Sequence, residues 1–444
     1  MFRRVLVANR GEIALRIIRA CEELGIETVA VYSTADVDCL HVERATQKVC
    51  IGPPDPRKSY LSIPSLIAAA KNSGCEAVHP GYGFLAESAS FAEACAANGL
   101  TFIGPAVDSI RALGDKSLAK QLMADAGLPI IPGSPGPVAD TAEAQAWAAR
   151  VGYPVMLKAA AGGGGRGMRR VETAAELERS YRAAAAEAEG AFGDGGLYVE
   201  KVIVEPRHVE IQIVGDGKGG VATFVERDCS IQRRHQKVLE ETPSPAIAGS
   251  VRERMQSEVA EACSALKYAG AGTVEFLVDA EGNYYFMEMN TRVQVEHPIT
   301  EVLSGVDIVK EQIRVAAGHG LSRQGPQAYA GHAMEFRINA EDPARGYTPQ
   351  AGVIKRLRLP GGPGVRVDTH VYQGYSVPPY YDSLLAKLIV WDGDRDSCLS
   401  RGRRALAELL VEGVPTTRDL HLAILRHPDF VRGRYSTSFL ERSL

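Results

Sequence analysis

The chain has 444 residues, of which 45% are hydrophobic, and this length is enough for two or three domains with ordinary cores. Its 50 Lys and Arg residues nearly balance 54 Asp and Glu residues, so the net charge of -4 gives no electrostatic reason to expect nucleic acid or an acidic membrane as a partner. No stretch reaches the length of a transmembrane helix, and the N-terminal segment is too short and too polar for a signal peptide. We therefore expect a cytoplasmic protein that binds neither nucleic acid nor membrane.

Eight cysteines are scattered along the chain, and no two of them form a C-x-x-C pair. This distribution is typical of reduced thiols in a cytoplasmic protein. We expect every cysteine except Cys229 to serve as a small buried hydrophobic residue.

The N-terminal stretch predicts a strand, a helix and a second strand. Residues 4–8 are apolar, residues 14–24 place apolar side chains at helical spacing, and residues 28–32 are apolar again. This order begins a doubly wound, Rossmann-like sheet. A dinucleotide-binding domain would carry G-x-G-x-x-G in the first turn, whereas residues 9–12 are Asn-Arg-Gly-Glu, so binding of NAD loses its main support.

A glycine-rich turn that contains Tyr82 follows an expected strand at residues 77–79. Open sheets of this class bind ligands at the carboxyl ends of their strands, although a plain tight turn is favoured when this motif is taken alone. We expect the first domain to close near Gly114, with a new helix beginning at Lys116. A lysine at a helix start is unfavourable for the helix dipole and hints at an anionic partner.

A second glycine-rich segment, residues 162–167, connects two expected strands. The strand before it carries Lys158, and another strand, not a helix, follows it at residues 168–171. A P-loop would run directly into a helix and end in G-K-[ST]. We therefore expect the loop amides, together with Lys158 and Arg166, to fold over phosphates as a flap, in preference to a flexible linker.

Several strands are expected between residues 197 and 242. Residues 197–204 are apolar and suit recognition of an adenine edge by the backbone, and residues 221–227 are expected to pair back on residues 207–214. Residues 228–237 are expected to end this sheet in a dense cationic stretch. A solvated basic patch is the alternative. We favour cations that pair with specific acids, because four acids flank this stretch: Glu226, Asp228, Glu240 and Glu241.

The segments 272–278 and 284–290 predict a β-hairpin. Antiparallel pairing about a turn centred on Glu281 and Gly282 would place Glu275 opposite Glu288, and a divalent cation would reverse their repulsion. With Asn290 these residues offer only hard oxygen donors, which suit Mg2+ or Mn2+ and not zinc. A solvated hairpin face would show the same alternation, and this stretch alone does not separate the two interpretations.

The residues after this hairpin carry a cation, an amide and a carboxylate, namely Arg292, Gln294 and Glu296. Such a group can hold a small anion and take a proton from it, with Arg292 as the clamp and Glu296 as the general base. Further on, residues 331–342 alternate so that one polar face carries Glu335, Arg337 and Asn339. A helix is expected at about residues 396–410.

Six motifs, taken together, resemble the biotin carboxylase family of ATP-grasp ligases over essentially the full chain. They are Ala-Asn-Arg-Gly-Glu-Ile-Ala (8–14), His-Pro-Gly-Tyr-Gly-Phe-Leu (79–85), Gly-Gly-Gly-Gly-Arg-Gly-Met (162–168), Arg-Asp-Cys-Ser-Ile-Gln-Arg-Arg-His-Gln-Lys (227–237), Glu-Met-Asn-Thr-Arg-Val-Gln-Val-Glu-His-Pro (288–298) and Arg-Ile-Asn-Ala-Glu-Asp-Pro (337–343). The resemblance implies an α/β and α+β protein with an N-terminal Rossmann-like domain (1–114), an ATP-grasp domain (115–330, lid about 131–203) and a C-terminal mixed α/β domain (331–444).

The resemblance also implies the chemistry: ATP phosphorylates bicarbonate to carboxyphosphate, which delivers CO2 to N1 of biotin on a carrier protein. ATP would be bound by Lys116, Lys158, Gly164, Gly165, Glu200, Lys201, His208, Gln232, His235, Glu275, Glu288 and the backbone at Val202 and Ile203. Two Mg2+ or Mn2+ ions would be held by Glu275, Glu288 and Asn290. Bicarbonate would contact Lys237, Arg292, Gln294 and the backbone of Val295, with Glu296 as its base. Arg337 would stabilise the biotin enolate, and Tyr82 would lie beside the biotin ring.

No covalent enzyme nucleophile is required in this scheme, so the resemblance gives Cys229 a structural role. The implied partners are a biotin carboxyl carrier protein and carboxyltransferase subunits of acetyl-CoA carboxylase or a related acyl-CoA or pyruvate carboxylase. Because no Met-Lys-Met biotinylation motif is present, we expect these to be other chains or a C-terminal part of a longer polypeptide. A homodimer is also implied, with Arg16, Arg19, Glu23 and Arg366 at its interface. Three residues depart from the family pattern: Val202, Thr242 and Ser244.

Two rival functions compete with this one. A carbamoyl-phosphate or purine-pathway ligase would share the fold and the metal ligands but should lack the Arg337 region and Tyr82. A nucleotide-sensing protein without turnover would not need Glu288, Arg292 and Glu296 together.

Overall fold

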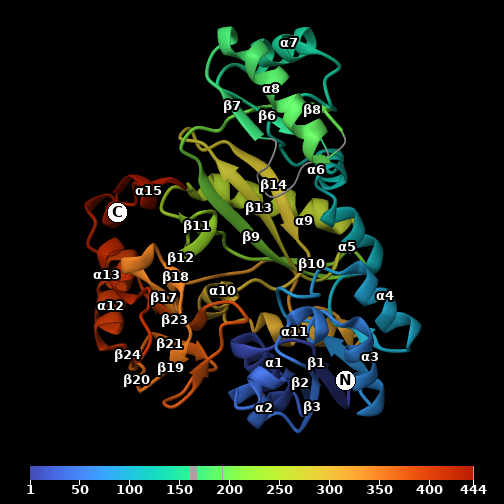
Figure 1. The fold of residues 1–444 in the computed structure, drawn as a ribbon, viewed down its shortest axis with the longest axis vertical. Helices are drawn as coiled ribbons and strands as arrows, with labels where there is room; N and C mark the ends of the chain where they lie inside the picture. The colour runs from blue at the N-terminus through green and yellow to red at the C-terminus, as the bar shows by residue number, and fades with distance from the viewer. Residues whose placement is uncertain (161–167, 193, 444) are drawn as a thin grey trace. The chain divides into compact units, whose positions relative to one another are not determined.

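The computed structural model describes residues 1–160, 168–192 and 194–443 (Figure 1). Contacts divide the chain into two compact units. The large unit comprises Met1–Leu128, Arg207–Phe276 and Glu288–Leu444, and the small unit comprises Pro129–Pro206 and Leu277–Met287. Each unit has its own apolar core, so the two are described in turn.

The N-terminal part of the large unit is a five-stranded parallel sheet with strand order β3-β2-β1-β4-β5. This confirms the predicted doubly wound sheet. The strands are β1 (Arg4–Val7), β2 (Glu27–Ser33), β3 (Gln47–Gly52), β4 (Ala77–His79) and β5 (Thr101–Phe102). The helices are α1 (Gly11–Glu23), α2 (Leu40–Arg44), α3 (Ile63–Asn72), α4 (Ala89–Ala97) and α5 (Val107–Gly114), with short 3-10 turns at Thr34–Asp36 and Pro56–Lys58.

A ten-stranded sheet forms the centre of the large unit, with the order β14-β13-β9-β11-β12-β16-β23-β21 and with β10 and β15 beside it. Its strands are β9 (Arg207–Asp216), β10 (Val221–Thr223), β11 (Arg227–Arg233), β12 (Gln236–Thr242), β13 (Ala269–Val278), β14 (Tyr284–Asn290), β15 (Gly325–Pro326), β16 (His332–Asn339), β21 (Val365–Thr369) and β23 (Leu384–Asp392). The sheet runs without a break from the ATP-grasp segment into the C-terminal segment, because β12 pairs with β16.

The expectation that residues 228–237 end the sheet is wrong. These residues form β11, the turn after it and the start of β12, which lie in the middle of the sheet between β9 and β16. The reason is that the acids of the neighbouring strands neutralise the cations of this hairpin, so it does not need solvent on its polar face. Nearly all residues of β11 are buried.

Alternation along β16 separates two environments. Met334, Phe336 and Ile338 belong to an apolar core that also includes Leu399 and Leu406 of a C-terminal helix. The remaining helices of the large unit are α6 (Lys116–Asp125), α9 (Gly249–Ala265), α10 (His297–Ser304), α11 (Ile308–Ala316), α12 (Arg395–Glu408), α13 (Arg418–Ile424), α14 (Pro428–Val431) and α15 (Phe439–Ser443). Short elements complete it: β17 (Glu341–Asp342), β18 (Thr348–Pro349), β19 (Gly352–Val353), β20 (Arg356–Arg358), β22 (Ser376–Val377), β24 (Leu410–Glu412) and a 3-10 turn at Pro343–Arg345.

The small unit contains a three-stranded antiparallel sheet with the order β7-β6-β8 and two helices. Its elements are β6 (Val155–Ala159), β7 (Met168–Val171), β8 (Leu197–Lys201), α7 (Thr141–Val151) and α8 (Ala174–Phe192). The pairing of β6 with β7 confirms that the glycine-rich segment joins two strands. Residues 161–167, and with them Gly164, Gly165 and Arg166, lie outside the described residues.

Two boundaries in the small unit differ from the prediction. The strand expected at residues 197–204 ends at Lys201, because its partner β6 begins only after Pro154, which has no N–H for the ladder. The turn of the β13–β14 hairpin closes with the N–H of Asp279 donating to the Asn283 carbonyl at 2.9 Å, which centres it on Glu281. Gly282 supplies the positive φ of 85° that such a three-residue loop requires.

All eight cysteines lie among the described residues and are free thiols, and seven of them are buried. Cys50 is exposed, against expectation, because it lies on β3 at the edge of the N-terminal sheet. Of the helices in the described part of the chain, none combines the length and apolar character that a membrane crossing requires.

Candidate active site

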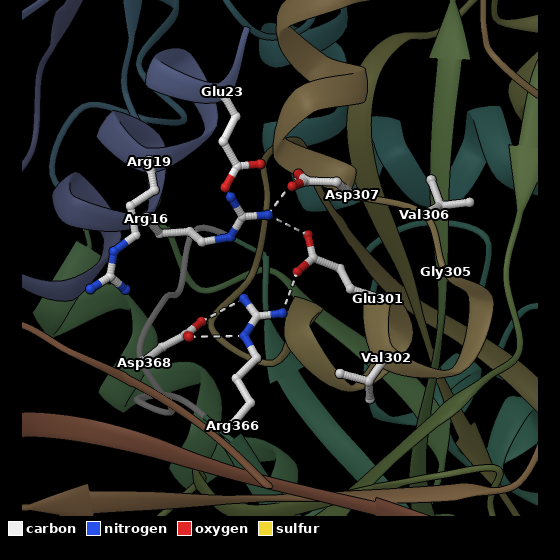
Figure 2. A pocket seen from close by; sticks show the side chains of 10 residues that line it. All are labelled: Arg16, Arg19, Glu23, Glu301, Val302, Gly305, Val306, Asp307, Arg366 and Asp368. Carbon is white, nitrogen blue, oxygen red and sulfur yellow. Dashed lines mark hydrogen bonds and ion pairs between the residues drawn. The ribbon is translucent and has the colours of Figure 1, made fainter. Parts of the chain in front are cut away.

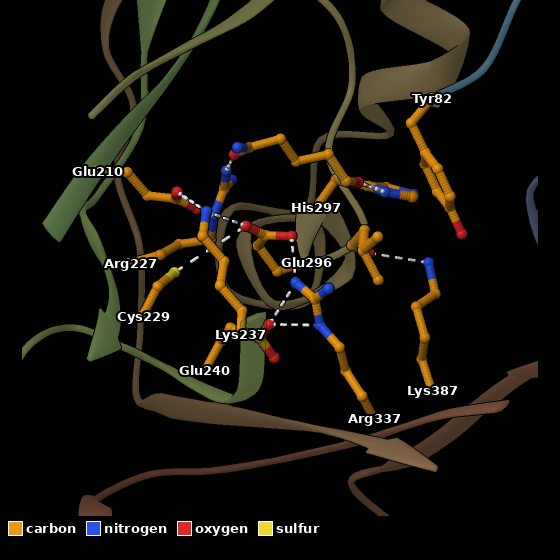
Figure 3. Close-up of polar contacts among 12 residues, drawn as sticks. Tyr82, Glu210, Arg227, Cys229, Lys237, Glu240, Glu296, His297, Arg337 and Lys387 are labelled. Atoms are coloured by element: carbon orange, nitrogen blue, oxygen red, sulfur yellow. Dashed lines mark hydrogen bonds and ion pairs between the residues drawn. The ribbon is translucent and has the colours of Figure 1, made fainter. Parts of the chain in front are cut away.

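A buried carboxylate, Glu296, lies immediately before α10 with a cation on each of its oxygens (Figure 3). The Lys237 ammonium on β12 is 2.7 Å from Oε1, and the Arg337 guanidinium on β16 donates to Oε2 at 2.9 Å. Only 1% of Glu296 is exposed. Three residues that are far apart in the sequence, and that the sequence singled out separately, are thus brought together.

The charges of this cluster are matched. Burial alone would raise the pKa of Glu296, but Lys237, Arg337 and Arg227 hold it well below its usual range. Burial alone would lower the pKa of Lys237, but Glu210, Glu275 and Glu296 raise it well above its ordinary value. The carboxylate and the ammonium are therefore both charged at neutral pH.

Arg227 is a fully buried residue for which the sequence predicted no role. All five of its N–H groups donate, to Glu210 (2.5 Å), Gln212 (2.8 Å), Thr300 (3.0 Å), Thr273 (3.3 Å) and Gln294 (2.9 Å). Because the Oε1 atom of Gln294 accepts from Arg227, its amide nitrogen is turned toward Glu275, to which it donates at 2.6 Å. The other oxygen of Glu210 accepts from Lys237 at 2.6 Å. The alternation of β9 was the available signal for Glu210, since that pattern groups polar residues on one strand face.

Glu275 is the shared partner of several residues predicted to bind ATP, metal or bicarbonate. Its Oε1 accepts from Lys237, Asn290 and Gln294, and its Oε2 lies 2.8 Å from His208 Nε2. Burial alone would raise the pKa of Glu275, but Lys237 and His208 hold it well below its usual range. One ligand atom each of His208, Glu210 and Glu275 lies within 4.8 Å of the others, a spacing that a metal ion would accept.

The predicted metal ligands are only partly brought together. Asn290 donates to Glu275 at 2.9 Å, whereas the ion-pair partner of the half-exposed Glu288 is Lys116, at 3.3 Å. Arg292 donates to Asn290 at 2.7 Å and to Glu87 at 2.9 Å. Sequence reasoning missed Glu87, because no periodic pattern links it to a residue 205 positions away.

Other predicted nucleotide residues have local partners. The Gln232 amide donates to His208 Nδ1 at 2.6 Å when the histidine proton is on Nε2, which faces Glu275. His235 is exposed at the turn between β11 and β12. In the small unit, Lys158 pairs with Glu200, and Lys201 donates to the carbonyls of Gly152 and Tyr153 at 2.8 and 3.0 Å. Val202 and Ile203 follow β8 and are half-buried.

Cys229 lies 4.0 Å from Glu296, but it does not have the character of a nucleophile. Burial raises the pKa of its thiol well above the ordinary value, so it carries no thiolate at neutral pH. Thr242 and Ser244, which depart from the family pattern, donate to the Glu226 carbonyl and to the Asp228 carboxylate, both at 2.7 Å. Each hydroxyl therefore adds a hydrogen bond to a buried acceptor that alanine could not make.

The remaining predicted residues, Tyr82 and Val295, have buried charged partners. The Tyr82 hydroxyl donates to Glu12 at 2.6 Å, and the Val295 carbonyl accepts from Lys387 at 2.9 Å. Figure 3 shows where Tyr82 and Lys387 lie relative to Glu296.

An antiparallel sheet that presents buried acids and cations, in a chain whose smaller unit carries a glycine-rich segment between two paired strands, defines a ligase of the ATP-grasp class. Three family models match along the chain: biotin carboxylase N-terminal domain at residues 1–110, the ATP-binding domain of the carbamoyl-phosphate synthase L chain at residues 115–324, and biotin carboxylase C-terminal domain at residues 335–442. The chain belongs to the biotin carboxylase family.

Named relatives agree over nearly the whole chain. A biotin carboxylase from Nostoc sp. is 54% identical over 99% of both chains, and a pyruvate carboxylase subunit from Methanothermobacter thermautotrophicus is 50% identical over 99% of this chain and 90% of its own. A crystal structure of biotin carboxylase from Campylobacter jejuni superposes with a TM-score of 0.92 at 48% identity, covering 100% of this chain and 99% of that one. These relatives identify a biotin-carboxylating ligase and not the carbamoyl-phosphate or purine-pathway alternative.

Proposed function

We propose that this protein carboxylates biotin on a biotin carboxyl carrier protein, using ATP and bicarbonate, with carboxyphosphate as the intermediate. The observation that carries this proposal is the buried Glu296 carboxylate with Lys237 on one oxygen and Arg337 on the other. One base between two cations suits a reaction in which an anion is first deprotonated and a second, enolate-like anion is then stabilised.

In the first half-reaction, bicarbonate is bound by Lys237, Arg292, Gln294 and the backbone of Val295. The lysine lies within 3 Å of three carboxylates, so an incoming anion competes for its charge. When Lys237 turns to bicarbonate, the pKa of Glu296 rises and the carboxylate becomes a better base. Glu296 takes the bicarbonate proton, a bicarbonate oxygen attacks the γ-phosphorus of ATP, and ADP leaves.

The proposed nucleotide ligands are those that the family resemblance implies. The proposed set is Lys116, Lys158, Gly164, Gly165, Glu200, Lys201, Val202, Ile203, His208, Gln232, His235, Glu275 and Glu288. In the described structure Lys158 and Lys116 are paired with Glu200 and Glu288, so the phosphates would replace carboxylates as partners of these ammonium groups.

Two Mg2+ or Mn2+ ions fit the oxygen donors Glu275, Glu288 and Asn290. Four donor groups converge on the Glu275 carboxylate, which shows how strongly this site attracts positive charge. Asn290 now offers its amide nitrogen to Glu275 and its oxygen to Arg292, so rotation of one amide presents the oxygen instead. Bound ions would neutralise the charge of the phosphates.

In the second half-reaction, CO2 from carboxyphosphate is transferred to biotin. Arg337 stabilises the ureido oxygen of the biotin enolate, and Tyr82 lies beside the biotin ring. Arg337 also donates to Glu240 at 2.6 Å, which fixes its guanidinium plane relative to Glu296.

The proposed partners are a biotin carboxyl carrier protein, carboxyltransferase subunits and a second copy of this chain, in a cytoplasmic acetyl-CoA, acyl-CoA or pyruvate carboxylase. A cavity of about 360 Å³ contains the residues expected at the homodimer interface (Figure 2). In it Arg16 pairs with Glu301 and Asp307, and Arg366 pairs with Glu301 and Asp368. The biotin carboxylase domain of a 2-oxoglutarate carboxylase from Hydrogenobacter thermophilus is described as a dimer. It is 48% identical, with a TM-score of 0.90, over 99% of this chain and 97% of that one.

We also propose a division into three domains, with boundaries at residues 114 and 330.

Phosphate release from ATP tests the function directly. We expect slow release with bicarbonate alone and a clear stimulation by free biotin. A flat trace with saturating bicarbonate and biotin would instead support a nucleotide-sensing protein without turnover.

A further inference from the structure

Lys387 is a fully buried lysine on the central sheet, with none of its side chain exposed. It lies on β23 directly across from Arg337 on β16 and from Asp368 on β21. A buried ammonium is costly unless it is paired and hydrogen-bonded, so its partners identify its role.

The first partner is the main chain of the segment that carries the base. Lys387 Nζ donates to the Val295 carbonyl at 2.9 Å. This carbonyl belongs to the peptide that leads into Glu296, so the ammonium fixes the orientation of that peptide plane. The same segment, residues 292–296, supplies every proposed bicarbonate contact except Lys237.

The second partner is Glu12, on the first turn of α1. Lys387 Nζ lies 2.9 Å from Glu12 Oε1, and the same oxygen accepts from the Tyr82 hydroxyl at 2.6 Å. Glu12 is 4% exposed, and its other oxygen has no hydrogen-bond partner among the described residues. One carboxylate oxygen therefore receives both the lysine and the tyrosine.

These contacts form one continuous connection, from Tyr82 through Glu12 and Lys387 to the Val295 carbonyl. Its ends are the residue assigned to biotin and the backbone assigned to bicarbonate. The Lys387 ammonium thereby ties the N-terminal part that carries Tyr82 and Glu12 to the loop before α10, in addition to the contact of Arg292 with Glu87.

We propose that Lys387 and Glu12 are positioning residues that couple the place of the biotin ring to the geometry of the bicarbonate-binding segment. The inference rests on the proposed function, since it uses the assigned roles of Tyr82 and Val295. Neither residue touches the reacting atoms; each acts by fixing a group that does.

The test compares Lys387→Met, which keeps the aliphatic stem and removes the ammonium, with Tyr82→Phe, which keeps the ring and removes the hydroxyl. We expect Lys387→Met to raise KM for both bicarbonate and free biotin on the order of tenfold, with KM for ATP changed by less than about twofold, because sub-ångström misplacement affects orientation first. Tyr82→Phe should raise KM for bicarbonate even in the slow reaction without biotin. In the Lys387→Met background it should have no further effect on that constant, because the connection is already broken.

Tyr60→Phe is the matched control. Its hydroxyl also donates to a buried carboxylate that binds a cation, Asp36 with Arg10. Among the described residues, no hydrogen bond or ion pair joins Tyr60, Asp36 or Arg10 to residues 292–296. We expect a lower Tm for this variant with unchanged KM values.

Three results would overturn the coupling. The first is a fall in kcat and a rise in every KM by the same factor in Lys387→Met. The second is that the two substitutions raise KM for bicarbonate independently, so that their factors multiply in the double variant. The third is an unchanged KM for bicarbonate in Tyr82→Phe. The third outcome decides the matter even if Lys387→Met does not fold. If the wild-type protein releases no phosphate with bicarbonate and biotin, the proposed function itself fails, and this is a different result.

Discussion

The two units of the chain hold their charged residues differently. In the large unit the site carboxylate, Glu296, is 1% exposed and has a cation on each oxygen, and the surrounding cations are themselves held by buried acids. In the small unit the Lys158 side chain is 36% exposed and has one ion-pair partner, Glu200, on the neighbouring strand. The Glu296 charge in the large unit is therefore shielded from solvent, whereas the Lys158 charge in the small unit is accessible to solvent.

Under the proposed function, this difference follows from what each unit would bind. Bicarbonate is small, so its recognition and deprotonation require groups held in fixed positions before it arrives. Phosphates are larger and carry more charge, and a half-exposed lysine can exchange a carboxylate for them at little cost in desolvation. The contrast predicts that changes in the large unit affect catalysis and stability together, whereas changes in the small unit affect nucleotide affinity.

Acid should unfold the large unit first, and this is the largest effect we expect. Burial lowers the pKa of His79 and of His370 to about 3, and hydrogen bonds from His332 and Arg395 overcome burial to lower the pKa of Glu241 to about 2. Groups with a depressed folded pKa stabilise the protein above their unfolded pKa, and this stability is lost as the pH falls. Between pH 4.5 and 3 each such group costs about 1.4 kcal/mol per pH unit.

Buried acids with a raised pKa do not oppose this loss in that range. Burial raises the pKa of Glu240 to about 7, and its contribution is already complete below pH 4.5. The small unit contains no histidine. The two tryptophans separate the units, since Trp147 lies in the small unit and Trp391 in the large one. In single-tryptophan variants we expect the Trp391 fluorescence transition at higher pH than the Trp147 transition, and a single coincident transition would contradict the comparison.

Glu296→Ala should abolish bicarbonate-dependent ATP hydrolysis and leave ATP binding in place. The substitution removes the base, and the loss should be about 10²- to 10⁴-fold in rate. Equilibrium binding of a fluorescent ATP analogue and phosphate release measure the two properties separately. Glu296→Gln, which keeps the volume and the hydrogen bond from Arg337, controls for repacking, and undiminished turnover in either variant would remove the proposed role.

Arg337→Ala should uncouple ATP cleavage from biotin carboxylation. Loss of one charged group at a developing oxyanion costs about 10²- to 10³-fold in rate, here in carboxylation. ATP cleavage should fall less, because Lys237 still faces Glu296 at 2.7 Å. Carboxybiotin formation and ADP formation in the same samples give the ratio, and equal losses of the two would refute the assignment.

Local patterns in the sequence predicted the parts of this site that lie on single strands. The bounds of β14, Tyr284–Asn290, are those expected, and alternation along β16 placed Glu335 and Arg337 on its polar face, away from the Met334 core. Motif resemblance then brought the separate strands into one function.

The supporting partners were not predictable in the same way. Arg227 reaches Gln294 across 67 positions, and Lys387 reaches Val295 across 92. Such contacts depend on which strands become neighbours in the sheet, and no periodicity of a single strand records that choice. A buried cation also resembles a solvated one in sequence, which explains why residues 228–237 were expected at the end of the sheet.

Arg227→Met tests whether the enclosed cations orient the site. Without the guanidinium the Gln294 amide can rotate and Glu210 keeps only Lys237, so we expect KM for bicarbonate to rise about tenfold. Stability should fall by about 3–5 kcal/mol, because a buried ion pair loses one partner. Arg252→Met is the matched control, since Arg252 donates twice to the buried Glu226 at 2.6 Å. A similar rise in bicarbonate KM in both variants would show a general loss of stability and not orientation of Gln294.

Lys158→Met should have a smaller effect on the unfolding free energy than Arg227→Met, and its kinetic effect should be confined to the nucleotide. The lost charge-assisted contact to phosphate is about 1.5–3 kcal/mol, which corresponds to a rise of roughly 10- to 100-fold in KM for ATP. KM for bicarbonate should hardly change, and the unfolding free energy should fall by less than in Arg227→Met, because the Lys158 side chain is 36% exposed although Glu200 is buried. Lys48→Met on the exposed edge strand β3 serves as the control. A bicarbonate KM that rises as much as the ATP KM would show that the small unit also shapes the anion site, and the division of tasks between the two units would then be wrong.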